Sequence, residues 1–166
     1  EKSKEEDTME DEKDTNTTQG LLFDEIEAEY EEEDDYGSTD GAESLSSSDE
    51  IVRAVANILK KSDEIKASDI HIEPQENELR IRYRVDGILT TLFNIPKKKA
   101  SGILARTKII ARLDVAEKRI PQDGRIRVKF GNDNLDFRVS TLPGKYGEKI
   151  VLRALRSDNS ILNLGK

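Results

Sequence analysis

The sequence predicts an α+β domain in which a largely antiparallel sheet packs against helices, preceded by a disordered acidic tail. Apolar residues recur at helical spacing in two segments and alternate in six others, in the order helix, three strands, helix, three strands. The charge is divided as well. Residues 1–50 hold 21 acidic and 3 basic side chains, a net charge of −18, whereas residues 51–166 hold 14 acidic and 24 basic ones, a net charge of +10.

The tail, residues 1–48, has the composition of a disordered acidic linker. Blocks such as EYEEEDDYGSTD and SLSSSDE carry few groups to bury and cannot offset the entropy lost on ordering. One stretch within it, LLFDEIEAEY at 21–30, places Leu22, Phe23, Ile26 and Tyr30 at roughly helical spacing. This stretch is either a transient helix in the linker or a docking motif for a basic surface.

The first half of the folded region is predicted as a helix followed by three strands. The helix covers about 50–61, with Ser47 and Glu50 as a capping box and an apolar face at i, i+3, i+4 spacing. Strands follow at 69–73, 79–85 and 88–93. Asp86-Gly87 is a strong signal for a tight hairpin turn.

The second half repeats this order. A helix is expected over 100–113 with Ile103, Leu104, Ile110 and Leu113 facing inward, followed by strands at 126–130, 135–140 and 149–155. These apolar faces suffice for one small core of about 110 residues, a size that folds alone.

Several classes of chemistry are excluded or disfavoured by composition. The chain has no Cys and one His, so thiolate sites and His-rich metal sites are not expected, and no metal is predicted. No apolar run approaches the ~20 residues of a membrane span. The phosphate-binding pattern GxxxxGK[ST] does not occur, and LPGKYGEK at 142–149 has the wrong spacing and is expected to be a hairpin loop. His71, two residues before Glu73 on one strand face, is expected to be structural.

The arginines are the most informative polar residues. Arg80, Arg82 and Arg84 form a stripe on one strand face, which is typical of a solvated surface. Arg138 and Arg153 instead interrupt apolar strands. If residues 141–148 form a hairpin, positions that sum to about 290 pair, which places these two arginines within a residue or two of each other. Two guanidinium forks on a rigid sheet make an anion clamp. The alternative is a structural role, with pairing to Asp136 or Glu148.

Four strings carry a resemblance to one family: ASDIHIEP (67–74), RYRVDGIL (82–89), LDVAEKRIPQDGRI (113–126) and DFRVSTLPGKYGEKIVLRAL (136–155). The chain resembles the type II secretion and type IV pilus assembly ATPases, called traffic ATPases. The resemblance implies an acidic disordered linker over 1–48, a PAS-like N-terminal domain over 49–158, and at 159–166 the start of a linker to a RecA-like ATPase core that this chain lacks.

The resemblance also implies a site and its partners. Members are bacterial cytoplasmic hexamers that use ATP and Mg²⁺, and two arginines of the PAS-like domain reach the nucleotide phosphates; by motif these are Arg138 and Arg153. The full-length protein is then an ATPase, while this part binds no cofactor and is inactive alone. Expected partners are the core of the same chain, neighbouring subunits of a homohexamer and inner-membrane platform proteins, without nucleic acid. One departure is Lys66, where the family has Gly.

Two functional classes follow from these observations. The leading one is a non-catalytic module of a secretion or pilus motor that supplies arginines to the nucleotide site and couples hydrolysis to the machinery. The competing one is an autonomous anion- or nucleic-acid-binding module, suggested by the net charge of +10 and by the run Lys97-Lys98-Lys99. The few aromatic residues and the tail of net charge −18 argue against the second class.

Overall fold

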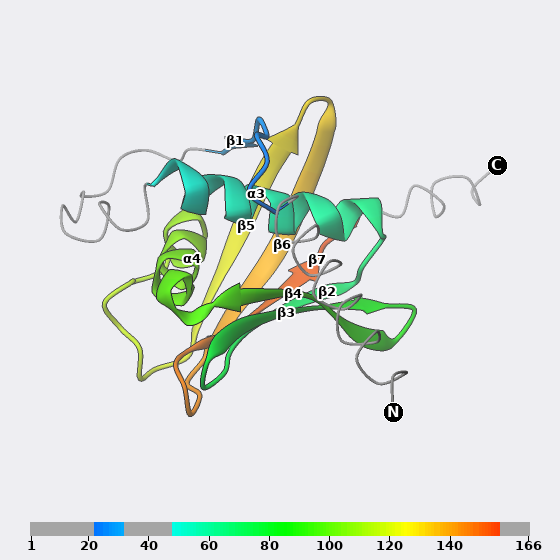
Figure 1. Cartoon of the computed structure of the whole chain (residues 1–166). Coiled ribbons are helices and arrows are strands. Elements are labelled where there is room, and N and C mark those ends of the chain that lie inside the picture. Colours follow the sequence, from blue (N-terminus) through cyan, green and yellow to red (C-terminus); the bar gives the residue numbers. More distant parts are fainter. Residues whose placement is uncertain (1–21, 32–47, 157–166) are drawn as a thin grey trace, which may run out of the picture.

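Seven antiparallel strands and two helices make up the part of the chain that the computed structural model describes, residues 22–31 and 48–156 (Figure 1). The helices lie on one face of the sheet, so the predicted α+β class is confirmed. The strand order is β1-β5-β6-β7-β2-β3-β4. The elements are β1 (Glu29–Tyr30), α3 (Asp49–Glu64), β2 (Asp69–Pro74), β3 (Glu78–Val85), β4 (Ile88–Pro96), α4 (Lys97–Ile110), β5 (Gln122–Phe130), β6 (Asp133–Leu142) and β7 (Lys149–Ala154).

Helix α3 confirms the first predicted helix and is one turn longer. Its N-cap is Ser48, whose hydroxyl accepts from the Ile51 N–H at 3.3 Å. The predicted cap at Ser47 is therefore wrong by one residue. Glu50 accordingly lies in the first turn, where its charge suits the helix dipole, and it pairs with Lys99 of α4.

Helix α4 is displaced from its predicted range. It begins at Lys97, directly after Pro96, because a proline can end a strand and precede a helix without loss of a backbone bond. It ends before Arg112, which takes a left-handed backbone conformation with φ of 61°. Leu113 therefore lies beyond the helix, although it still packs against the core.

The core fills the space between the sheet and the two helices. Tyr83 lies fully buried at its centre, where its hydroxyl donates to the Ile58 carbonyl of α3 at 2.7 Å and its ring meets Phe93 edge-on at 6.2 Å. Gly124 allows β5 to pass close to the end of α4, since a Cβ there would lie 2.6 Å from the Ala111 carbonyl oxygen. The predicted turn at Asp86 and Gly87 is confirmed, with φ of 50° and 81°.

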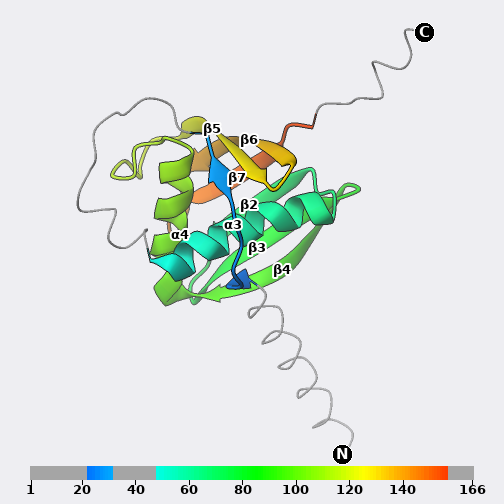
Figure 2. The ribbon, with the colours of Figure 1, turned by 90° about the horizontal axis from the view of Figure 1, so that it is seen from above.

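Residues 22–31 differ from both the predicted disorder and the predicted helix. They cross α3, and Glu29 and Tyr30 then pair with β5 as strand β1 (Figure 2). Leu22, at the other end of this stretch, is completely buried. The prediction of a disordered linker is thus wrong for these ten residues. The rest of the predicted tail and the predicted linker at 159–166 lie outside the described residues, and the predicted domain boundaries stay predictions.

Candidate functional site

Arg138 and Arg153 lie directly opposite each other on β6 and β7. They are Cα partners in the register, and both are exposed. Their strand neighbours Phe137, Val139 and Leu152 are buried under the helices, so both arginines point to the open face of the sheet. Opposite side chains of an antiparallel pair have Cβ atoms about 4.5–5.5 Å apart. The predicted proximity of the two residues is therefore confirmed.

The two arginines belong to a line of charged residues that crosses the sheet. The register places Arg125 opposite Arg138, Asp69 opposite Arg153, and Arg84 opposite Asp69. We call this line, one residue from each of β5, β6, β7, β2 and β3, the arginine row. It brings four guanidinium groups and one carboxylate together on one face, which makes the row strongly positive.

Asp69 orients the middle of the arginine row. Its carboxylate is buried, and it accepts from Arg153 Nε at 3.2 Å and from the Ser68 hydroxyl at 3.0 Å. Arg84 Nε lies 3.6 Å from the same carboxylate. The Arg153 side chain nevertheless stays 72% exposed, so its Nε is bonded to Asp69 while the rest of the guanidinium group faces solvent.

Arg125 is held at the end of the row by Asp136. Its Nε donates to Asp136 Oδ1 at 2.7 Å and a second nitrogen donates to Oδ2, a bidentate arrangement that raises the pKa of the guanidinium. Arg138 differs, because its side chain makes no hydrogen bond or ion pair with any residue in 22–31 or 48–156. Within the arginine row, Arg138 is the member whose whole guanidinium group is available to a ligand.

The predicted structural alternative is wrong in its choice of partners. Asp136 pairs with Arg125 and Arg127, and neither Arg138 nor Arg153 reaches it. Glu148 is buried and pairs with Lys108 of α4 at 2.7 Å. The charge that does hold Arg153 is Asp69, 84 positions earlier in the chain.

Like charges directly opposite each other on a sheet are unfavourable by a few tenths of a kcal/mol up to about 1 kcal/mol. The pair Arg138 and Arg153 carries this cost without a carboxylate between the two groups. An anion placed over both forks would offset the repulsion and could accept several charge-assisted hydrogen bonds. The row is thus suited to the oxygens of a phosphate group.

A second charged cluster lies beside the row around Glu73, whose carboxylate accepts from Arg82 at 2.6 Å and lies 3.0 Å from Lys149 and 3.6 Å from His71. Burial alone would raise the pKa of Glu73, but the hydrogen bonds from Arg82 and Lys149 outweigh it and the pKa is lowered. Burial and the charge of Lys149 lower the pKa of His71 against the opposing effect of Glu73. His71 and Glu73 thus lie side by side on one strand face, as their spacing in the sequence predicts.

Sequence reasoning missed three members of the site: Arg125, Asp69, and Arg84, which strand alternation assigns to a solvated stripe. A turn at 131–134 implies that positions summing to about 265 pair, which would have placed Arg125 within two residues of the position opposite Arg138; the observed sum is 263. No local signal marks Asp69, because its contact with Arg153 depends on the pairing of β2 with β7. LPGKYGEK forms the connection between β6 and β7, as predicted. Within residues 22–31 and 48–156, no three His, Asp or Glu side chains are gathered closely enough to hold a metal ion.

The pattern of the family described as "Type II/IV secretion system protein" matches residues 44–166, about three quarters of the chain. The chain belongs to this family. Its family relatives include a "Putative type II secretion system protein E" of Escherichia coli, 49% identical over 118 residues that make up 69% of this chain and 24% of that protein. The "Type IV pilus assembly ATPase PilB" of Myxococcus xanthus is 44% identical over 117 residues, 70% of this chain and 21% of PilB.

The chain therefore spans about a quarter of the length of the secretion-family relatives that it matches. Among solved structures, the ATPase DotB of Legionella pneumophila aligns with a TM-score of 0.41 and 18% identity, over 67% of this chain and 34% of DotB. The family resemblance seen in the four sequence strings is confirmed by the family match. No helix in the described ranges is both long and apolar enough to cross a bilayer.

Proposed function

We propose that this region supplies Arg138 and Arg153 to the nucleotide bound by the ATPase core of a longer protein, which powers type II secretion or type IV pilus assembly. The observation that carries the proposal is the direct opposition of two outward arginines, of which Arg138 has no partner among the described residues. Relatives in the family are named as secretion proteins and as a pilus assembly ATPase.

The two arginines divide the task. Asp69 holds Arg153 in one orientation, so its free N–H groups are pre-organised toward an oxyanion. Arg138 can turn its whole fork to a phosphate oxygen. Together they act as arginine fingers that neutralise charge on the transferred phosphoryl group. ATP and Mg²⁺ are held by the core, because this chain contains no GxxxxGK[ST] loop.

In this proposal the region works within a larger assembly in the bacterial cytoplasm. Its partners are the core of the same polypeptide, neighbouring subunits of a homohexamer, and inner-membrane platform proteins that receive the motion. Closure of the core on nucleotide draws the arginine row inward and moves the whole sheet with it. The region taken alone binds ATP weakly and hydrolyses none, since it offers arginines without a phosphate loop.

The test is ATPase turnover of the full-length protein with Arg138→Ala or Arg153→Ala. We expect each to lower turnover at least roughly tenfold, which corresponds to about 1.4 kcal/mol of barrier, and we expect the double variant to lose less than the product of the two. Arg80→Ala is the matched control, because Arg80 lies outside the row and pairs with Glu78 at 3.8 Å. Unchanged turnover in both single variants would refute the proposal.

The competing function is an autonomous module that binds anions or nucleic acid. The arginine row favours it, because an open basic face also suits a phosphodiester backbone. Binding of DNA to the chain that weakens steeply with salt, together with normal turnover of the Arg138→Ala motor, would support this function instead.

A further inference from the structure

Residues 22–31 are held to the rest of the molecule by hydrogen bonds at both ends. Glu29 and Tyr30 pair with Lys129 and Val128 of β5, and the Glu31 N–H donates to the Arg127 carbonyl at 3.1 Å. At the other end, the Asn57 side chain donates to the carbonyls of Leu22 and Asp24 at 2.7 and 2.9 Å. All of the partner groups belong to the domain that follows residue 48.

Two aromatic side chains of this segment lie under cations. Lys99 Nζ is 4.2 Å from the centre of the Phe23 ring, and the Arg106 guanidinium is 5.5 Å from the centre of the Tyr30 ring. Both cations come from α4. Leu22 fills a fully buried position and adds an apolar contact to these interactions.

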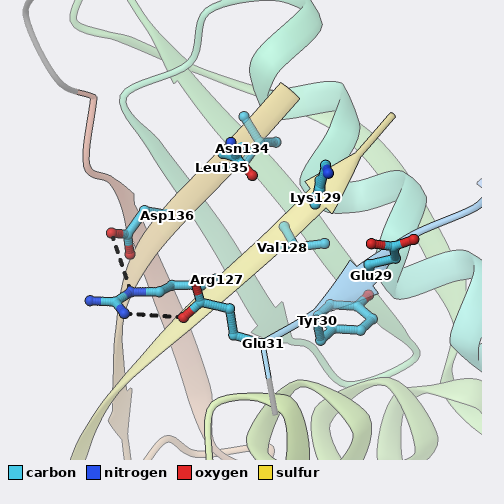
Figure 3. Close-up of a pocket in the computed structure, with 9 residues that line it drawn as sticks. All are labelled: Glu29, Tyr30, Glu31, Arg127, Val128, Lys129, Asn134, Leu135 and Asp136. Atoms are coloured by element: carbon cyan, nitrogen blue, oxygen red, sulfur yellow. Dashed lines mark hydrogen bonds and ion pairs between the residues drawn. The ribbon is translucent and has the colours of Figure 1, made fainter. Parts of the chain in front are cut away.

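The charges of the segment and of its binding surface are complementary. Residues 22–31 contain five acidic side chains and no basic one. The surface offers Arg112, which donates to the Glu31 carbonyl at 2.6 Å, and Arg127, which lies 3.1 Å from the Glu31 carboxylate. Arg127 also approaches Asp136, beside a hollow of about 400 Å³ between β1, β5 and β6 (Figure 3).

Most of these interactions are individually weak. A strand of two residues adds few hydrogen bonds, and the ion pair of Glu31 with Arg127 is exposed to solvent, so it contributes little to the binding of the segment. Release of the segment would leave β5 as a bare sheet edge, and at the other end of the segment it would empty the position that Leu22 fills near Leu92 and Phe93. A bare edge is a template for any strand of suitable sequence.

A second copy of the chain offers the same strand and the same edge. The 16 residues between Glu31 and Ser48 can span at most about 55 Å. This reach lets the segment of one copy arrive at the β5 edge of a copy beside it. A linker of this kind gives the segment an effective concentration in the millimolar range at the β5 edge of its own chain. Binding to the β5 edge of a second copy competes with binding within the chain where the copies are held close together.

We propose that the edge of β5, with Lys99 and Arg106 of α4, is a docking site for residues 22–31 of a second copy of this chain, and that the same segment occupies it within a single molecule. This is strand addition to a sheet edge, with backbone bonds for affinity and the aromatic–cation contacts for register. The segment lies outside residues 44–166, the part of the chain that matches the family.

Cysteine trapping tests the exchange, because the chain has no cysteine of its own. Glu29→Cys is placed in one preparation and Lys129→Cys in another; the two positions are Cα partners, both are exposed, and their spacing suits a disulfide. The preparations are mixed and oxidised. We expect a disulfide-linked dimer with one chain of each kind, identified by mass spectrometry of the 29–129 link, in a yield that rises with protein concentration.

Two controls make the result decisive. Glu25→Cys mixed with Lys129→Cys is out of register and should give at least about fivefold less dimer, and an excess of a synthetic peptide of residues 22–31 should suppress the in-register dimer. The double variant in one chain should close the disulfide internally, which checks the register. The proposal is overturned if the in-register mixture gives no more dimer than the out-of-register one, or if the peptide leaves the yield unchanged.

Discussion

Arg138 and Arg153 face each other across β6 and β7, but they are held differently: Arg153 is bonded to the buried Asp69, whereas Arg138 has no partner among the described residues. The pair therefore combines one oriented guanidinium group with one whose hydrogen-bonding capacity is entirely unused. Neither arginine contributes to the core, because both side chains lie on the face opposite the helices. Their contribution to stability can thus be separated from their contribution to function.

Arg138→Ala should leave the free energy of unfolding of this chain within about 0.5 kcal/mol of wild type, since it removes a like-charge contact and breaks no ion pair with a described residue. Arg153→Ala should cost somewhat more, about 1 kcal/mol, because Asp69 loses one of its partners. Urea denaturation measures both values. If Arg138→Ala unfolds the chain, where no nucleotide is present, the pair is structural and the assignment to phosphate contacts fails.

Lys66→Gly should stabilise the fold by roughly 0.5–1 kcal/mol. Lys66 follows the end of α3 with φ of 56°, a left-handed conformation that costs a residue with a Cβ more than it costs glycine. The exposed ion pair of Lys66 with Asp63 at 3.3 Å is too weak to offset this gain. Lys60→Gly, in the exposed interior of the same helix, is the control and should destabilise by about 1 kcal/mol. A loss of stability in Lys66→Gly would contradict the expectation.

Lys108→Met should destabilise the domain by about 3–5 kcal/mol, since it strands the buried carboxylate of Glu148 without its charge partner. Lys108 also donates to the carbonyls of Val115 and Glu117, so the connection after α4 should loosen. The double variant Lys108→Met/Glu148→Leu should recover much of the loss in thermal or urea denaturation. A cost below 1 kcal/mol for the single variant would mean that water already solvates the pair.

Stability should fall as the pH drops from 7 toward 5. The pKa of His71 is lowered in the folded state, whereas in the unfolded chain it is about 6.5. As the pH falls, the unfolded chain therefore binds the proton first, which stabilises the unfolded state relative to the folded one. The lowered pKa of Glu73 adds a second loss below about pH 4.3. Urea denaturation across this range is the measurement. His71→Gln should flatten the profile between pH 7 and 5 and leave the loss at lower pH, whereas an unchanged slope above pH 5 would exclude His71 as its source.

Local sequence patterns determined most of the sheet and the orientation of its side chains. Alternation in DFRVS and KIVLRAL turns Arg138 and Arg153 outward, and the short connection between these strands brings them face to face, because a hairpin leaves few registers open. The α+β class and the six predicted strands follow from the same periodicity. These features depend on neighbours that are close in the chain, so the sequence alone suffices for them.

Only the tertiary structure decided which distant groups meet. The pairing of β2 with β7 gives Arg153 its partner Asp69, and no local pattern encodes a contact across 84 positions. Residues 22–31 show the same limit more sharply. Their apolar spacing favours a helix, but an isolated helix of ten residues is marginal in water. In the extended conformation the same residues gain contacts with the edge of β5 and with the cations of α4. Long-range packing outweighs the weak local preference there, because the free energy of forming so short a helix is close to zero.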